Sequence, residues 1–248
     1  MDLSSAFNRV NRTKLWAALG DMGMDEGILN FFMDLHQNLA AVVRYGKDGE
    51  CTPHFSLRRG VRHGCILAPF LLLLYINQLE AILVKSSKDI AYIGKHPLAA
   101  LLYADDAVLI ARTALGLQKL VDAFVDFMAG LDLSTNTAKS QVMVLGPRSS
   151  KSKSYVVKGV AMTNVNQFSY LGVRFDSRCT WGPLLKSHCA NISRAVGALF
   201  SFASRLGRSP TDTMIKIYQA NCVSVAMYGC EIWGYCNVGP FQIIENRS

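Results

Sequence analysis

The stretch that decides the fold is Leu101-Leu102-Tyr103-Ala104-Asp105-Asp106-Ala107-Val108-Leu109-Ile110, in which two adjacent carboxylates stand between two apolar runs. This pattern predicts a β-hairpin with the acidic pair at its turn. Burying two neighbouring negative charges without compensation would be costly, through desolvation and mutual repulsion. A divalent cation at an exposed turn removes that cost, and hard carboxylate oxygens suit Mg²⁺. For the pair taken alone, a solvated Asp-Asp turn is the alternative interpretation.

The composition bounds the class of protein. The 248 residues are 50% hydrophobic and 18% charged, which predicts one large domain or two small ones with a sizeable core. The longest apolar run, residues 66–84, contains Pro69 and Glu80 and favours a core helix over a membrane span. No apolar signal segment is visible near the N-terminus. Seven cysteines without C-x-x-C spacing indicate reduced thiols in an intracellular protein, either nuclear or cytoplasmic.

The net charge of +8 is distributed unevenly along the chain. From Lys139 to Arg208 there are eleven Lys or Arg residues and one acid, a local charge of +10, whereas the remainder carries −2. Such a division suits a protein in which one part binds nucleic-acid phosphates while the other binds metal. We expect Lys151, Lys153 and Lys158 to bind nucleic acid, and a solvated basic face is the alternative.

Hydrophobic periodicity predicts how the chain is organised. Helices are expected over residues 13–40, 69–85 and 117–131, and a hairpin over 41–57. A polar connection at 148–154 precedes short strands near 155–160 and 168–175, and helices follow Trp181. We therefore expect three parts: a mixed part of helices and strands with the acidic hairpin (1–147), connecting strands (148–180) and a helical region (181–248).

Five short motifs in a fixed order resemble those of reverse transcriptases from non-LTR (LINE-type) retrotransposons. They are Asp2-Leu3-Ser4-Ser5-Ala6-Phe7-Asn8, similar to D-x-x-x-A-F-D; Gly60-Val61-Arg62-His63-Gly64-Cys65-Ile66-Leu67-Ala68-Pro69, similar to G-x-R-Q-G-x-x-x-S-P; the hairpin with Tyr103-Ala104-Asp105-Asp106; Asn136-Thr137-Ala138-Lys139-Ser140, similar to N-x-x-K-[ST]; and Phe168-Ser169-Tyr170-Leu171-Gly172, similar to the primer-grip hairpin. The chain departs from these patterns at Asn8, His63 and Ala68, where Asp, Gln and Ser are usual. The stretch Tyr228-Gly229-Cys230-Glu231-Ile232-Trp233-Gly234 resembles the helical thumb and the segment after it.

The resemblance implies a role for each motif. Asp2, Asp105 and Asp106 would bind two Mg²⁺ ions, for which Mn²⁺ can substitute, and Lys139 would act as general acid or phosphate contact. The nucleotide-binding residues would be Phe7, Arg62, His63 and Gly64, with Phe7 as the steric gate that favours deoxynucleotides. The primer-grip residues would be Phe168, Tyr170, Leu171 and Gly172.

The resemblance also implies an α+β fold. A polymerase-type palm, an antiparallel sheet with helices on one face, would be followed by a helical thumb-like region. Asp2 and Asp105 lie 103 positions apart in the sequence, so they can share metal ions only if their strands are neighbours in one antiparallel sheet.

The implied function is that of an RNA-directed DNA polymerase that adds deoxynucleoside triphosphates to a primer 3′-hydroxyl on an RNA template. We expect no membrane partner. In the family a fingers segment precedes the first motif, so we expect an N-terminally truncated domain that needs this segment or the rest of a polyprotein and is weak or inactive alone. The alternative is a catalytically inactive, nucleic-acid-binding remnant of such a domain.

Overall fold

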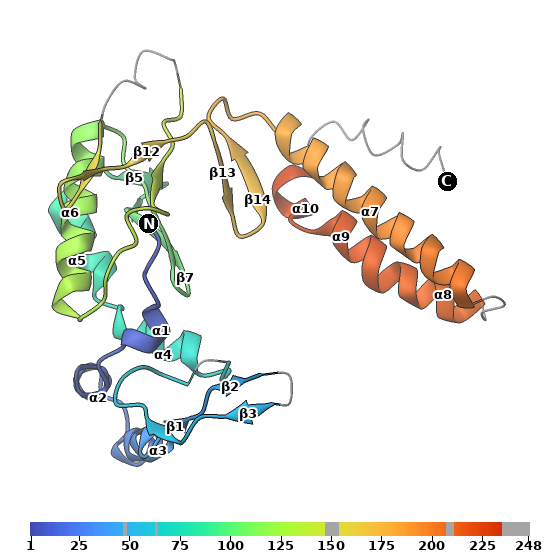
Figure 1. Cartoon of the computed structure of the whole chain (residues 1–248). Helices are drawn as coiled ribbons and strands as arrows, with labels where there is room; N and C mark the ends of the chain where they lie inside the picture. Colours follow the sequence, from blue (N-terminus) through green and yellow to red (C-terminus); the bar gives the residue numbers. More distant parts are fainter. Residues whose placement is uncertain (47–48, 63, 147–153, 207–210, 235–248) are drawn as a thin grey trace. The chain divides into compact units, whose positions relative to one another are not determined.

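The computed structural model describes residues 1–46, 49–62, 64–146, 154–206 and 211–234 (Figure 1). The contacts divide the chain into two compact units: Met1–Val142 with Lys153–Thr163, and Met143–Ser152 with Asn164–Ser248. The three-part division expected from the sequence, and the assignment of fingers and thumb, stay predictions. The six cysteines among the described residues form no disulfide with one another.

Helices and a β-hairpin form the N-terminal part of the first unit. The helices are α1 (Ala6–Arg9), α2 (Arg12–Asp21) and α3 (Glu26–His36). The single helix expected over 13–40 is interrupted between α2 and α3, where Gly23 has a φ of +80° and the Asp25 side chain caps α3. Strand β1 (Ala40–Ala41) pairs with β4 (Phe55–Ser56), and β2 (Arg44–Tyr45) with β3 (Glu50–Cys51), which confirms the hairpin expected over 41–57.

Three further helices supply the core of this unit: α4 (Ala68–Tyr75), α5 (Leu79–Ser86) and α6 (Ala114–Gly130). Helices α5 and α6 lie side by side (Figure 1), and Leu83 of α5 and Phe124 of α6 are fully buried. By length and composition alone Ala68–Ser86 could cross a membrane, a test that the core helices of soluble proteins also pass. In this chain the stretch is interrupted at residues 76–78, and α5 packs against α6, as expected of a core helix.

Two hairpins and the start of the chain form the sheet region. Strand β5 (Ala91–Ile93) pairs with β6 (His96–Leu98), and β7 (Ala100–Tyr103) pairs antiparallel with β8 (Asp106–Leu109). Residues 1–3 run beside β8: the backbone nitrogen of Met1 donates to the Ala107 carbonyl at 2.7 Å, and the Ala107 N–H donates to the Met1 carbonyl at 3.1 Å. On the other side Leu3 bridges to Thr135. Residues 1–3 therefore lie between β8 and residues 134–136.

The remaining strands of the first unit include a small hairpin held by α6. Strand β9 comprises Gln141–Val142, and β10 (Val156–Val157) pairs with β11 (Val160–Ala161). The Gln118 side chain of α6 donates to the Val156 carbonyl at 2.8 Å and accepts from the Val156 N–H at 3.0 Å. This two-way bond fixes β10, and with it the exposed turn that carries Lys158.

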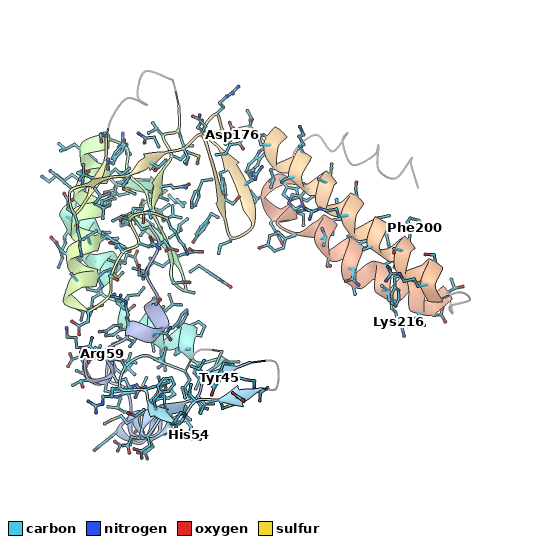
Figure 2. All side chains as sticks on the ribbon, viewed as in Figure 1. Tyr45, His54, Arg59, Asp176, Phe200 and Lys216 are labelled. Carbon is cyan, nitrogen blue, oxygen red and sulfur yellow. The ribbon has the colours of Figure 1, made fainter. Side chains whose placement is uncertain are left out.

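The second unit consists of a hairpin and a helical pair. After β12 (Thr163–Asn164), β13 (Gln167–Tyr170) pairs with β14 (Val173–Asp176), followed by α7 (Gly182–Leu206). Helix α8 (Thr211–Tyr218), the π-helical turn η2 (Gln219–Val223) and α9 (Ser224–Met227) pack along α7, and α10 (Cys230–Trp233) follows. Figure 2 shows Phe200 on α7 and Lys216 on α8. The buried core of this unit includes Val173, Leu184, Leu185 and Trp233. Within the described residues helices follow Trp181, as expected.

Three hydrogen bonds hold the loop after β4 against α1 and the residues that follow it. The N–H of Gly60 donates to the Val10 carbonyl and that of Val61 to the Phe7 carbonyl, both at 2.9 Å. The Arg12 guanidinium donates to the Gly60 carbonyl at 2.8 Å. Gly60 has a φ of +84°, and a Cβ there would lie 2.8 Å from the Asn8 Cα. The backbones can approach this closely only with glycine at position 60.

We predict that Gly60→Ala lowers the free energy of unfolding by about 2–4 kcal/mol, because it adds left-handed strain and a clash with backbone atoms that cannot rotate away. Urea unfolding followed by circular dichroism measures the change. The matched control is Gly20→Ala inside α2, where nothing lies within 4 Å of the new Cβ. In that variant the free energy of unfolding should rise by about 0.5–1 kcal/mol. Equal stability of the two variants would contradict the packing described here.

Candidate active site

Three aspartates gather where the start of the chain meets the β7–β8 turn. Asp2 forms an antiparallel bridge with Asp106, and Ala104 and Asp105 are the two turn residues between the paired Tyr103 and Asp106. Directly opposed residues on antiparallel strands project from the same face, with Cβ atoms about 4.5–5.5 Å apart. The register therefore brings Asp2 beside Asp106, with Asp105 next to them at the turn.

The electrostatics of this turn show that the carboxylates repel one another. The pKa of Asp106 is raised, first by partial desolvation and then by the negative charges of Asp105 and Asp2. Such carboxylates are suited to a divalent cation, whose positive charge would attract each of them and offset their mutual repulsion. Within the described part of the chain, however, no three His, Cys, Asp or Glu side chains are grouped closely enough to hold an ion as they stand. Binding therefore requires these side chains to rotate on a backbone whose register already places them together.

The turn also contains a strained residue that the sequence did not single out. Ala104 has a φ of +52°, in the left-handed region that alanine rarely adopts. A non-glycine residue in this region costs about 1–3 kcal/mol and persists only where the surrounding structure holds it, most often at functional sites. The two pairs that flank it, Tyr103 with Asp106 and Asp2 with Asp106, supply that constraint.

A hydrogen-bonded turn ties the Lys139 segment to Asp2. The Asn136 N–H donates to the Asp2 carbonyl at 2.8 Å, and the Asp2 N–H donates to the Ser140 hydroxyl at 3.2 Å. Ser140, only 1% exposed, donates in turn to the Asn136 carbonyl at 2.8 Å. Lys139 itself is exposed on this turn. Sequence reasoning placed Lys139 and Ser140 in one motif but assigned no positioning role to Ser140, because the motif does not show which backbone groups its hydroxyl bonds.

The residues expected to bind the nucleotide lie on α1 and on the loop after β4. Phe7 is half-buried on α1, and its carbonyl accepts the Val61 N–H. Arg62 and Gly64 are exposed beyond that contact, and His63 lies outside the described residues. The structure therefore joins the backbone of Phe7 to the start of the loop, and the nucleotide-binding roles stay predictions.

The residues expected to bind nucleic acid and primer are divided between the units. Lys158 is exposed at the β10–β11 turn of the first unit with a φ of +49°, while Lys151 and Lys153 lie outside the described residues. In the second unit Phe168 and Tyr170 are half-buried on β13, and Leu171 and Gly172 are exposed at the turn to β14.

The second unit also contains Asp176, labelled in Figure 2, whose pKa is lowered mainly by the hydrogen bond from the Arg178 N–H.

We predict that Asp106→Asn is more stable than the wild type at pH 7. Because the pKa of Asp106 is raised in the folded state, ionisation of this group opposes folding above that pKa and has no effect below the unfolded value of 3.8. Asparagine cannot ionise, so its advantage should shrink as the pH falls toward 3.8 and vanish below it. Thermal unfolding midpoints from pH 3 to 8 measure this difference. A gain that persists at the lowest pH would show that repulsion is not its cause.

Comparison with known proteins identifies the same family that the sequence motifs resemble. The family model described as reverse transcriptase (RNA-dependent DNA polymerase) matches residues 1–175. The chain is 30% identical over 158 residues to a Pol polyprotein from the type-1 retrotransposable element R2 of Bradysia coprophila, covering 63% of this chain and 18% of the relative. It is 27% identical over 186 residues to the R2DM Pol polyprotein of Drosophila melanogaster, covering 71% of this chain and 17% of the relative.

A third relative is the probable RNA-directed DNA polymerase from transposon BS of Drosophila melanogaster, 28% identical over 208 residues, covering 77% of this chain and 22% of the relative. The chain thus spans about a fifth of the length of these relatives. The mixed helices and strands described above are consistent with the polymerase palm that the family model implies. The chain belongs to the reverse transcriptase (RNA-dependent DNA polymerase) family, within its non-LTR retrotransposon branch.

Proposed function

We propose that this chain carries the polymerase site of a LINE-type retroelement and joins deoxynucleotides to a primer 3′-hydroxyl on an RNA template. The observation that carries the proposal is the bridge between Asp2 and Asp106, which brings together carboxylates that lie over a hundred residues apart in the sequence. The raised pKa of Asp106 supports it, because desolvation and the charges of Asp105 and Asp2 outweigh the attraction of the Met1 ammonium, and a cation would offset this cost.

The three aspartates would hold the metal ions. Bound Mg²⁺ ions lower the pKa of an attacking hydroxyl and stabilise the attacking and leaving oxygens of an in-line displacement. Asp2 and Asp106 would act from neighbouring strands and Asp105 from the turn between β7 and β8. Because residues 1–3 are bonded on both sides, the backbone of Asp2 is held in place for this task.

The other motif residues would position the substrates. Lys139, held near Asp2 through Asn136 and Ser140, would donate a proton to the leaving pyrophosphate or bind its phosphates. Phe7 would exclude a 2′-hydroxyl, with Arg62, His63 and Gly64 beside the nucleotide. Lys151, Lys153 and Lys158 would bind backbone phosphates of the template–primer without reading its sequence.

We predict weak primer extension by this chain on an RNA template with Mg²⁺ or Mn²⁺, measured on gels with a labelled DNA primer. Asp105→Asn should reduce the rate by about 10²–10³, the loss typical of removing one group that stabilises transition-state charge. The matched control is Asp126→Asn, an exposed aspartate of α6, which should extend the primer at the wild-type rate.

Extension that survives Asp105→Asn would contradict the proposed site. Absence of extension by the wild type, with binding to the template–primer duplex retained, would instead support the catalytically inactive remnant.

We also predict that duplex binding weakens steeply with salt and shows little sequence preference. Replacing Lys151, Lys153 and Lys158 together by Gln should reduce the slope of log affinity against log salt by up to about 0.9 per lost phosphate contact. The control replaces Lys85, Lys88 and Lys119, three exposed lysines outside the basic segment, so the net charge changes equally. Equal slopes for the two triple variants would show that the basic segment is only a solvated face.

A further inference from the structure

Arg12, the first residue of α2, bonds three backbone carbonyls at once. Its Nε donates to the Gly60 carbonyl at 2.8 Å, Nη1 to the His36 carbonyl at 2.9 Å and Nη2 to the Arg59 carbonyl at 3.2 Å. A guanidinium presents its donors in a rigid planar fork, so each nitrogen can serve a different acceptor. A lysine places all its donors on one atom and could not span these three carbonyls in the same way.

The charge of Arg12 is not neutralised by a carboxylate. Among the described residues the ion pairs are those of Lys14 and Arg59 with Asp132. The Arg12 side chain is half-buried, and desolvation lowers its pKa. Taking a cation partly out of water is costly unless its donors are bonded, and here carbonyl oxygens accept them. The contribution of Arg12 is therefore the position of these carbonyls and not a charge pair.

Two of the three carbonyls belong to the loop base, by which we mean residues 59–61. Figure 2 labels Arg59, the first of them. The Gly60 and Val61 N–H groups donate to carbonyls of α1 and of the residue that follows it. Arg12 bonds the carbonyls of Arg59 and Gly60, so the loop base is held through both its donors and its acceptors. The loop base leads directly into Arg62.

The third carbonyl lies at the C-terminal end of α3. His36 is the last residue of this helix, where carbonyls have no partner within the helix and cations are favoured. The pKa of His36 is lowered, first by burial and further by the positive charges of Arg12 and Arg62, while the hydrogen bond to the Phe32 carbonyl opposes the shift. The charge of Arg62 therefore acts at the same end of α3 that Arg12 bonds.

We propose that Arg12 is a positioning residue that holds the loop base so that the residues following it can receive a deoxynucleoside triphosphate. The inference rests on the proposed function and deepens it, because it adds to the nucleotide side of the site a residue that does not touch the nucleotide. Arg12 acts through the backbone of residues 59–61, and its fork joins α2, α3 and the loop base at one point. A positioning role requires the fork itself, whereas a purely electrostatic role requires only the charge.

The test measures binding of a fluorescently labelled deoxynucleoside triphosphate, by anisotropy, to the chain in complex with an RNA–DNA primer–template duplex. The primer ends in a dideoxynucleotide, so no extension takes place and the measurement is independent of the catalytic rate. Arg12→Gln and Arg12→Lys should each weaken nucleotide binding by about tenfold, the effect of losing a hydrogen bond from a charged donor. The affinity for the duplex should stay at the wild-type value, because the lysines proposed to bind it lie elsewhere.

The matched control is Arg9→Gln, which removes the same charge from an exposed arginine of α1 and should bind the nucleotide as the wild type does. Hydrogen exchange followed by mass spectrometry reports on the loop base directly. The Gly60 and Val61 amides should exchange about tenfold faster in both Arg12 variants than in the control. Arg12→Lys retains the positive charge, so it decides the test should Arg12→Gln fail to fold.

Wild-type nucleotide affinity in Arg12→Lys would overturn the inference and leave the proposed function intact, because the charge without the fork would then suffice. Equal losses of nucleotide and duplex affinity would also overturn it, since Arg12 would then serve the fold as a whole. Unchanged exchange of the Gly60 and Val61 amides would show that Arg12 does not act through the loop base. Failure of the wild-type chain to bind the nucleotide, with the duplex bound, would overturn both the inference and the proposed nucleotide-binding roles.

Discussion

The pairing of residues 1–3 between β8 and residues 134–136 is the constraint on which the candidate site depends. Met1 exchanges two backbone hydrogen bonds with Ala107, and the Asp2 carbonyl accepts the Asn136 N–H. These bonds and bridges bring together three parts of the sequence, each with one of the family's motifs. Without them Asp2 would have no fixed relation to the acidic turn, and the carboxylates could not act together.

The same pairing has an electrostatic cost that the fold retains. It places Asp2 beside Asp106 and adjacent Asp105, so the pKa of Asp106 rises through desolvation and like charge. A protein selected for stability alone would not keep three carboxylates at one turn, because each repels the others. We interpret this repulsion as a loss of stability that accompanies the proposed cation site.

Backbone strain marks the hairpins that carry the predicted site residues. Ala104 at the acidic turn, Lys158 at the β10–β11 turn and Leu171 at the β13–β14 turn all have positive φ values without being glycine. In each hairpin the strained residue lies at the tip, where it is either exposed or next to an aspartate. Asparagine or glycine would relieve the strain at all three positions. Ser5, Asn38, Asp132 and Cys179 also have positive φ values, so such strain is not confined to these hairpins.

The sequence by itself determined the elements whose signals are local. The two apolar runs on either side of Asp105 and Asp106 predicted the β7–β8 hairpin. The helical spacing of Leu120, Phe124 and Met128 predicted α6, because that period follows from helix geometry. The motifs also identified the family. The breaks after α2 and α4 were not predicted, since a few residues that end a helix early change its apolar pattern little.

Only the tertiary structure decided how the motifs meet. It paired Asp2 with Asp106 and assigned positioning roles to Arg12 and Ser140 through hydrogen bonds to backbone groups. Each of these bonds joins residues far apart in the sequence, and a backbone carbonyl or N–H has no side chain by which a sequence could reveal its partner. Such contacts form only when the chain has folded, so no periodicity or spacing records them.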